Sequence, residues 1–160
     1  MIIDNEPCSP DELESLYDYL MGTPVAKSVR DMFNAGKMVA YHAQITRLEE
    51  LGEHYLIWSN LGGFIQRPKY KVKEAYDVLR NAKDYDIRSN CNWITVNDYI
   101  DLLAQNALQL KITVAGTIVD STPIDIIIDG CKRTTAFHEY KRRLGVEDVD
   151  FNLMILRHIP

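Results

Sequence analysis

The chain has 160 residues, of which 46% are apolar and 26% charged, and a formal net charge of -5. These values are typical of one globular domain large enough to bury a core, and they exclude both a disordered chain and a global positive field that would attract a polyanion. The acidic amino terminus and the lack of a long apolar run predict a protein that is neither secreted nor embedded in a membrane.

Two helices are predicted at the amino-terminal end. In SPDELESLYDYLMG, Ser9 is a helix N-cap and Glu12 completes a capping box, followed by apolar residues at helical spacing. TPVAKSVRDMFNAG repeats the pattern, with Thr23 as the cap and Gly36 as the stop. We therefore expect residues 1–37 to form a helical N-terminal extension.

The middle of the chain, residues 38–93, is predicted to contain a hairpin, a helix and a loop. MVAYHAQITRL and EHYLIWS are β-like runs joined around Leu51 and Gly52, which indicates a β-hairpin. KYKVKEAYDVLRNA has apolar residues at helical spacing and predicts a helix. RSNCNW, which follows it, has no clear period and is interpreted as a loop.

The carboxy-terminal part has clearer patterns. TVNDYIDLLAQNAL predicts a helix, KITVAGTIV and PIDIIID predict two short strands, and VDFNLMIL predicts a final strand after a helix that starts near Gly130. That last helix is expected to face the core with Ala136, Phe137, Tyr140 and Leu144. The whole chain, residues 1–160, is therefore predicted to be a single α+β domain, with a small mixed sheet and flanking helices.

The junction between the second of these strands and its helix gathers residues suited to anion binding. A helix start leaves backbone N–H groups unpaired and carries the positive end of the helix dipole. Gly130 would let an anion approach the backbone, Lys132 and Arg133 add positive charge, and Thr134 and Thr135 offer hydroxyl donors. The junction predicts a phosphate site.

The segment IIDGCKRTTAF resembles the ParB/sulfiredoxin superfamily, whose signature is a glycine, two variable residues and an arginine opening a helix. Gly130, Arg133 and Ala136 fall on the signature positions. The segment is most similar to the sulfiredoxin version, G-C-H-R, in which the cysteine is the catalytic thiol. Cys131 takes the place of that cysteine, and Lys132 stands where the histidine would be.

The resemblance covers roughly residues 94 to 157 and implies a nucleotide-binding core over residues 94–160, whereas residues 1 to 90 match no family in this way. It implies binding of ATP or another nucleoside triphosphate with Mg²⁺, followed by nucleotide hydrolysis or phosphoryl transfer. The helix-turn-helix region that follows this module in chromosome-partition proteins is missing, so a complete partition protein is not expected. The implied nucleotide-binding residues are Gly130, Cys131, Lys132, Arg133, Thr134 and Thr135.

Catalysis would draw on Asp129, Cys131 and Arg133. Asp129 is the acidic residue nearest the junction and would hold Mg²⁺ or orient the attacking group; a role as helix cap or turn residue is left open. Cys131 is expected to have a lowered pKa beside the two cations, and a simple packing role is the alternative. Other acids that could serve are Asp98, Asp101, Asp120 and Asp125.

The remaining candidates for metal and redox chemistry are weak. His42 and His54 lie in the predicted hairpin without a third ligand at metal spacing, and His138 is expected at the surface, so no metal site is predicted. Cys8 and Cys91 are widely spaced from Cys131, which indicates neither a disulfide framework nor a zinc site and favours a cytoplasmic location.

A basic patch supplies an alternative function. Arg67, Lys69, Lys71 and Lys73 could contact nucleic acid or close over a nucleotide, although the same segment also reads as a solvated loop. The chain would then be a non-catalytic accessory module of a DNA-processing or DNA-modifying system. A third hypothesis is an interaction protein that uses its N-terminal helices, and a homodimer is left open. A secondary site is considered at Arg88, Ser89, Asn90 and Asn92.

Overall fold

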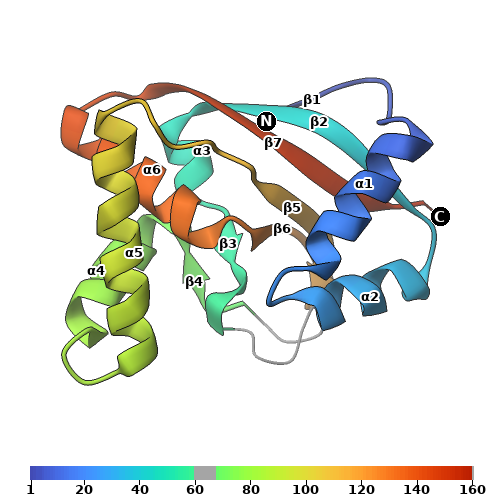
Figure 1. Ribbon diagram of the computed structural model, residues 1–160. Helices are drawn as coiled ribbons and strands as arrows, with labels where there is room; N and C mark the ends of the chain where they lie inside the picture. Colours follow the sequence, from blue (N-terminus) through green and yellow to red (C-terminus); the bar gives the residue numbers. More distant parts are fainter. Residues whose placement is uncertain (60–67, 160) are drawn as a thin grey trace.

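The computed structural model describes residues 1–59 and 68–159. Over these residues the chain is an α+β protein in which helices flank a seven-stranded mixed sheet, as the sequence predicts (Figure 1). The helices are α1 (Pro10–Met21), α2 (Ala26–Ala35), α3 (Leu48–Gly52), α4 (Val72–Ala82), α5 (Ile87–Ala104) and α6 (Cys131–Leu144), with a 3-10 turn, η1, at Ile57–Ser59. The strands are β1 (Ile2–Ile3), β2 (Met38–Arg47), β3 (Tyr55–Leu56), β4 (Tyr70–Lys71), β5 (Thr113–Val119), β6 (Thr122–Asp129) and β7 (Asp148–His158).

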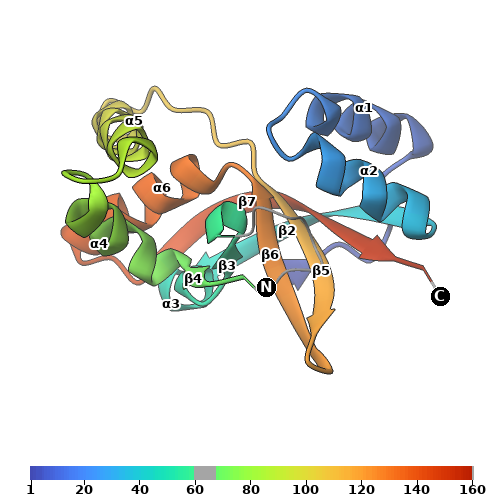
Figure 2. The same cartoon turned by 90° about the horizontal axis from the view of Figure 1, so that it is seen from below.

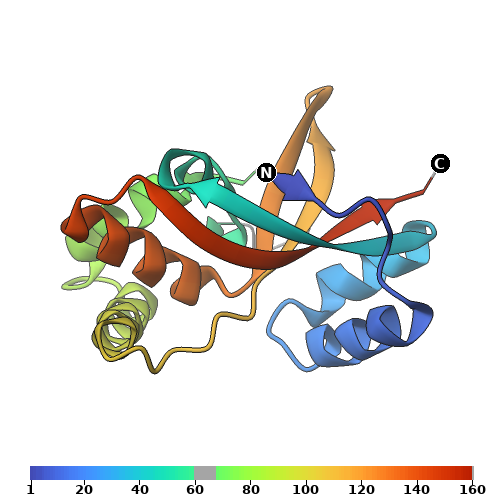
Figure 3. The same cartoon turned by 90° about the horizontal axis from the view of Figure 1, so that it is seen from above.

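Strands β2 and β7 form the longest pair of the sheet. They are antiparallel, with Met38 opposite His158 at one end and Arg47 opposite Asp148 at the other, and they run side by side in Figure 3. β7 pairs in parallel with β5, which forms a hairpin with β6, and β6 pairs in parallel with β3. The order β1-β2-β7-β5-β6-β3-β4 places β6, which leads into Gly130, between β5 and β3.

The core is built by β-branched and leucine side chains of these strands. Ile45 of β2, Val114 of β5, Ile127 of β6 and Ile155 of β7 are all 0% exposed. Burying one such side chain contributes roughly 1.5 to 3 kcal/mol relative to leaving it in water. The apolar residues that predict β5, β6 and β7 in the sequence are therefore also residues that form the core between the sheet and its helices.

The helices form two groups at the two ends of the molecule. In Figures 1 and 2, α4, α5 and α6 pack together at one end, and α1 and α2 lie at the other. The hydroxyl of Tyr76 in α4 donates to Asn97 of α5 at 2.8 Å and accepts from Arg143 of α6 at 2.8 Å, which ties the first group together. The junction of β6 with α6 lies between the two groups in Figure 2.

Several predicted elements are confirmed. α1 has the capping box: Ser9 Oγ accepts from the amide of Glu12, and the Glu12 carboxylate accepts from the amide of Ser9. α4 and the sequence from β5 to β7, including the start of α6 after Gly130, also form as predicted. None of the helices in the described part of the chain combines the length and apolar character that a bilayer-spanning helix requires.

The predicted hairpin around Leu51 and Gly52 is wrong. Residues 48–52 form the short helix α3, and β2 pairs with β1 and β7, whereas β3 pairs with β6 and β4. Alternating apolar residues show that a segment is extended, but they do not identify the strand it pairs with, since that strand is determined by packing across the whole sheet. The long register with β7 is available only once the carboxy-terminal strand has docked.

Three local predictions also need correction. Thr23 does not cap α2, which begins at Ala26; its hydroxyl donates instead to the carbonyl of Leu20 at 2.6 Å. RSNCNW is not a loop but the first part of α5, capped by Asp86. Leu144 is 57% exposed rather than buried, because it lies in the last turn of α6 where the chain leaves the core.

Candidate functional site

The backbone changes direction at Gly130, between β6 and α6. Gly130 has φ 86° and ψ 23°, a left-handed conformation that costs other residues about 1 to 2 kcal/mol. A Cβ at this position would collide with Ile112 Cδ1 and would lie 3.0 Å from the carbonyl oxygen of Lys111. Glycine is therefore required by the backbone conformation and by packing, before any ligand is considered.

The first turn of α6 presents amide groups without helical partners. The first hydrogen bond at this end runs from the amide of Thr134 to the carbonyl of Gly130, at 2.8 Å. The amides of Cys131, Lys132 and Arg133 precede that bond and have no acceptor within the helix. Together with the positive end of the helix dipole, they are suited to donate to an anion.

A pocket of about 480 Å³ opens at this helix start. Its walls come from the turn before α2, from η1, from α5, from the loop after α5 and from the β6–α6 junction. The volume lies within the range of small-molecule sites, roughly 300 to 1,000 Å³. Segments far apart in the sequence therefore converge on the position where the sequence predicts an anion.

The pocket has a cationic part and an aromatic part. Lys132 and Arg133, both half-buried, line it at the start of α6. Trp58 of η1 and Tyr99 of α5 line it from other elements, and Asp129 is the acidic residue among the described lining residues. Charge for phosphate groups and flat apolar surface for a ring are thus present in one cavity.

Arg133 and Asp129 form an ion pair at the start of α6. Arg133 Nη2 lies 3.2 Å from Asp129 Oδ2 and 3.4 Å from the hydroxyl of Tyr19, and the Arg133 and Asp129 side chains are 20% and 12% exposed. Asp129 therefore makes an ion pair and is not the helix cap, which is Gly130 without a side-chain hydrogen bond. Lys111 Nζ lies 3.5 Å from the centroid of the Tyr19 ring, so a further cation is found beside the last turn of α1.

The expected reactive thiol at Cys131 is contradicted by its surroundings. The residue is 7% exposed, and its sulfur donates to the carbonyl of Ile127 at 3.3 Å. Burial raises the pKa of the Cys131 thiol to about 12, and the coulombic effect of Lys132 does not offset this. The helix dipole and two neighbouring cations would lower the pKa of an exposed thiol, but desolvation outweighs them here. Cys131 is therefore a buried packing residue at the edge of the pocket.

The two threonines are also placed differently from the prediction. Thr134 and Thr135 are 0% and 1% exposed, and neither lines the pocket. The hydroxyl of Thr135 donates to the carbonyl of Cys131 at 2.8 Å, one turn earlier in the helix. Their hydroxyls are therefore turned into the protein, and the candidate phosphate contacts reduce to the backbone, Lys132 and Arg133.

His138 and Glu139 of α6 are buried, although the sequence predicts His138 at the surface. His138 packs against Gly52, where a Cβ would lie 3.0 Å from its Nε2, and burial lowers its pKa. Glu139 accepts from Arg142 and Arg143 at 2.7 to 3.0 Å. The middle of α6 thus serves packing against α3 and α4 rather than the pocket.

Two lysines of the predicted basic patch share one carboxylate in the structure. Arg67 lies outside the described residues. Lys71 and Lys73 both form ion pairs with Glu53, and together they lower the pKa of that carboxyl to about 2. Lys69 Nζ stands 5.0 Å from the ring centroid of Tyr70. The segment carries less uncompensated charge than the sequence indicates, which weakens the case for a polyanion contact there.

The other acidic and polar candidates lie away from the pocket lining. Asp125 forms an ion pair with Arg157 at 2.6 Å, and Asp120 lies in the turn of the β5–β6 hairpin with a φ of 48°. Asp98 and Asp101 are exposed on α5. Arg88, Ser89, Asn90 and Asn92 form the first turns of α5, where the hydroxyl of Ser89 donates to the capping Asp86. None of these residues lines the pocket.

The aromatic wall of the pocket was missed in the sequence. Trp58 lies in a run that reads as a strand, and Tyr99 lies on the apolar face of a helix, so both carry the pattern of core residues. Nothing in their local sequence marks them as pocket residues. Only the packing of η1 and α5 around the start of α6 brings them together.

Compared with known proteins, the chain matches no family model, no curated protein and no solved structure. The candidate site therefore rests on its geometry and on the short G-x-x-R resemblance at Gly130. Both concern the same helix start.

Proposed function

We propose that the chain binds a nucleoside triphosphate in the pocket at the start of α6 and that the bound nucleotide undergoes hydrolysis or phosphoryl transfer. The observation that carries this proposal is the pairing of a cationic helix start, with Lys132 and Arg133, and an aromatic wall, with Trp58 and Tyr99, in one pocket. The resemblance of the Gly130 segment to the ParB/sulfiredoxin signature supports the same ligand class.

Each half of the pocket suits one half of a nucleotide. Unpaired amides at a helix start, an arginine and a lysine are the usual partners of phosphate oxygens. An aromatic side chain in contact with a base contributes about 1 to 3 kcal/mol and tolerates different bases. A phosphate ion alone would use only the first half, so the aromatic wall favours a nucleotide over a free anion.

Phosphate binding would change the ion pair beside the pocket. In the structure, Arg133 Nη2 lies 3.2 Å from Asp129 Oδ2. An incoming phosphate would compete with Asp129 for this guanidinium. The carboxylate of Asp129 is then able to turn toward the phosphates and orient an attacking hydroxyl group. The donor set also accommodates Mg²⁺, which commonly takes one carboxylate together with substrate phosphates.

The proposal is tested by calorimetry with ATP, CTP, GTP and inorganic triphosphate, each with and without Mg²⁺. We expect at least one nucleotide to bind more tightly than inorganic triphosphate, because only the nucleotide contacts Trp58 and Tyr99. Lys132→Ala should weaken the binding by about tenfold or more, the loss expected for one charge-assisted contact. The matched control is Lys37→Ala, which removes an exposed lysine outside the pocket lining.

Arg133 needs a paired substitution, since its removal alone leaves Asp129 without its partner. Asp129→Asn with Arg133→Gln replaces the ion pair by two neutral amides of similar shape. We expect this double variant to fold, to lose nucleotide binding and to lose any turnover measured as phosphate release. Equal affinity of the wild-type protein for inorganic triphosphate and every nucleotide, or unchanged binding in both the Lys132 and the double variant, would contradict the proposal.

A further inference from the structure

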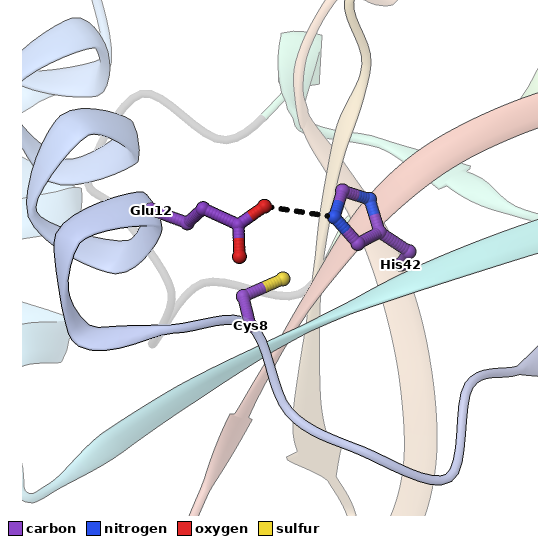
Figure 4. Close-up of side chains that lie close together, drawn as sticks. All are labelled: Cys8, Glu12 and His42. Atoms are coloured by element: carbon purple, nitrogen blue, oxygen red, sulfur yellow. Dashed lines mark hydrogen bonds and ion pairs between the residues drawn. The ribbon is translucent and has the colours of Figure 1, made fainter.

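Three side chains that bind metals in other proteins meet near the start of α1, whereas the pocket described above is lined by residues that follow the end of α1. Cys8 precedes α1, Glu12 lies in its first turn, and His42 lies on β2; their ligand atoms are all within 4.8 Å of one another (Figure 4). Glu12 Oε1 and His42 Nε2 are 3.2 Å apart. The sequence did not predict this group, because His42 is separated from the other two residues by about thirty positions.

Backbone pairing holds the cluster together. The amide of Asp4 donates to the carbonyl of His42 at 2.9 Å, and the amide of Cys8 donates to the carbonyl of Ala40 at 2.8 Å. The amino-terminal segment therefore runs along β2 and delivers Cys8 beside His42. Because these contacts involve only the backbone, they remain when the side chains of the cluster are changed.

The carboxylate of Glu12 is also oriented. Its Oε2 accepts from the amide of Ser9 at 2.9 Å in the capping box, which leaves Oε1 directed at the ring of His42. The side chains of His42 and Glu12 are 57% and 50% exposed, so an ion from solvent can reach them. Cys8 is half-buried beneath them and supplies the third atom.

We propose that Cys8, Glu12 and His42 bind a zinc ion, with the fourth tetrahedral position open to water or an external ligand. Bond lengths at zinc of about 2.0 to 2.3 Å place oxygen and nitrogen ligands about 3.3 Å apart and sulfur and nitrogen ligands about 3.6 Å apart. The Glu12–His42 contact, at 3.2 Å, already has this spacing. The sulfur lies within 4.8 Å of the other two ligand atoms, so each of its distances needs to shorten by about 1.2 Å or less. None of the three residues lines the pocket, so the inference does not depend on the proposed function.

The donor set identifies the class of metal. A thiolate and an imidazole favour zinc and related transition metals over Mg²⁺ and Ca²⁺, which prefer oxygen ligands alone. The sulfur of Met154, opposite His42 in the β2–β7 register, lies 4.0 Å from the sulfur of Cys8 and makes the surroundings softer still. Three protein ligands with one open position are typical of reactive zinc sites rather than closed structural ones.

The geometry argues against a Cys-His-Glu nucleophile. In such a triad the histidine uses one ring nitrogen for the cysteine and the other for the carboxylate. In Figure 4 the sulfur of Cys8 and the carboxylate of Glu12 both lie on the Nε2 side of the ring, and the second ring nitrogen lies on the side away from them. Three groups converging on one point suit a shared cation.

Titration of the metal-free protein with Zn²⁺ and with Co²⁺ tests the site. We expect one zinc ion per chain and, with cobalt, the visible bands of a tetrahedral ion together with a near-ultraviolet thiolate-to-cobalt band. Cys8→Ser should abolish the thiolate band, and Glu12→Gln and His42→Gln should each weaken zinc binding by at least tenfold, the smallest loss seen even for residues that only support a ligand.

The controls separate the site from adventitious binding and from misfolding. Cys91→Ser and Glu14→Gln remove an exposed thiol and an exposed carboxylate outside the cluster and should leave the cobalt spectrum and the zinc affinity unchanged. Glu12→Gln keeps the capping box, since glutamine serves at the same helix position. A cobalt thiolate band that survives in Cys8→Ser, or the lack of stoichiometric zinc binding in the wild-type protein, would overturn the proposal.

Discussion

At the residue scale, Gly130 illustrates how one position can satisfy two requirements. In the sequence, Gly130 is expected to be glycine so that an anion can approach the backbone at the helix start. The structure supplies a reason within the protein itself: a φ of 86° and the close approach of Ile112 and Lys111. A bulky substitution at Gly130 would therefore destabilise the fold, and loss of ligand binding in such a variant would not by itself identify a phosphate contact.

Gly130→Ala and Gly145→Ala form a matched pair for measuring this effect. Both glycines have positive φ, 86° and 69°, but a Cβ at Gly145 has no atom within 4 Å. We expect Gly145→Ala to lower the free energy of unfolding by about 1 to 2 kcal/mol through backbone strain alone. Gly130→Ala should cost more, because Ile112 must also move. Urea unfolding measures both, and equal losses would show that the contact with Ile112 is unimportant.

Cys131 shows the same competition between local and tertiary effects. Its neighbours in the sequence, a helix start and two cations, predict a lowered thiol pKa, with a packing role as the alternative. Burial against the core raises the pKa to about 12, so the sulfur remains a protonated thiol near neutral pH. The thiol pKa is raised by desolvation, which depends on how the rest of the chain covers this residue.

At the scale of elements, a buried carboxylate of α6 holds the arginine that reaches α4. Glu139 is 3% exposed and accepts hydrogen bonds from Arg142 and Arg143, and Arg143 also reaches Tyr76 of α4. Burial alone would raise the pKa of Glu139, but the hydrogen bonds from the two arginines outweigh it, so the pKa lies below its ordinary value. The ionised form therefore pairs with Arg142 and Arg143 and, through Arg143, supports the contact of α6 with Tyr76 of α4.

Glu139→Gln should remove a pH-dependent part of the stability. Because the folded-state pKa is lowered, the contribution of Glu139 is fully present above its unfolded pKa of about 4.3 and is lost as the pH falls through the lower folded value. We expect the variant to be less stable by about 1 to 2 kcal/mol at neutral pH. The difference from the wild-type protein should shrink below about pH 4.

Chemical unfolding at a series of pH values measures this difference, and Glu14→Gln on the exposed face of α1 is the control. Comparing variant with wild type cancels the titration of other carboxyls, including Glu53, whose pKa is also low. A stability difference that stays constant from neutral to acidic pH would show that the charge of Glu139 does not contribute.

At the scale of the whole molecule, β7 connects the two parts of the sheet. It pairs antiparallel with β2 on one side and parallel with β5 on the other, so the last strand in the sequence lies inside the sheet. Its side chains Phe151, Ile155 and Leu156 are 0% exposed. The fold is therefore completed only when the carboxy-terminal segment is in place.

Leu156→Ala should destabilise the whole protein. Removing a fully buried leucine typically costs about 2 to 5 kcal/mol, through lost burial and the cavity left behind. Leu144→Ala is the matched control, because this leucine, although predicted to face the core, is 57% exposed and should change the free energy of unfolding by less than about 0.5 kcal/mol. Thermal and urea unfolding of both variants provide the measurement, and similar effects would contradict the observed burial.

The sequence by itself determined the features that depend on neighbouring residues. The capping box of α1, the strand before Gly130 and the helix after it are readable because caps, turns and periodicity act over a few positions. The cationic half of the candidate pocket, Lys132 and Arg133, was predicted in this way. The α+β class follows from the same local patterns taken together.

The tertiary structure alone decided which segments become neighbours and which groups lose contact with water. It paired β2 with β7 instead of β3, buried Cys131 and Thr135, and brought Trp58 and Tyr99 to the start of α6. It also placed the cysteine and glutamate of the amino-terminal segment beside a histidine of β2. Such results depend on packing between segments distant in the chain, because desolvation and proximity are properties of the folded whole.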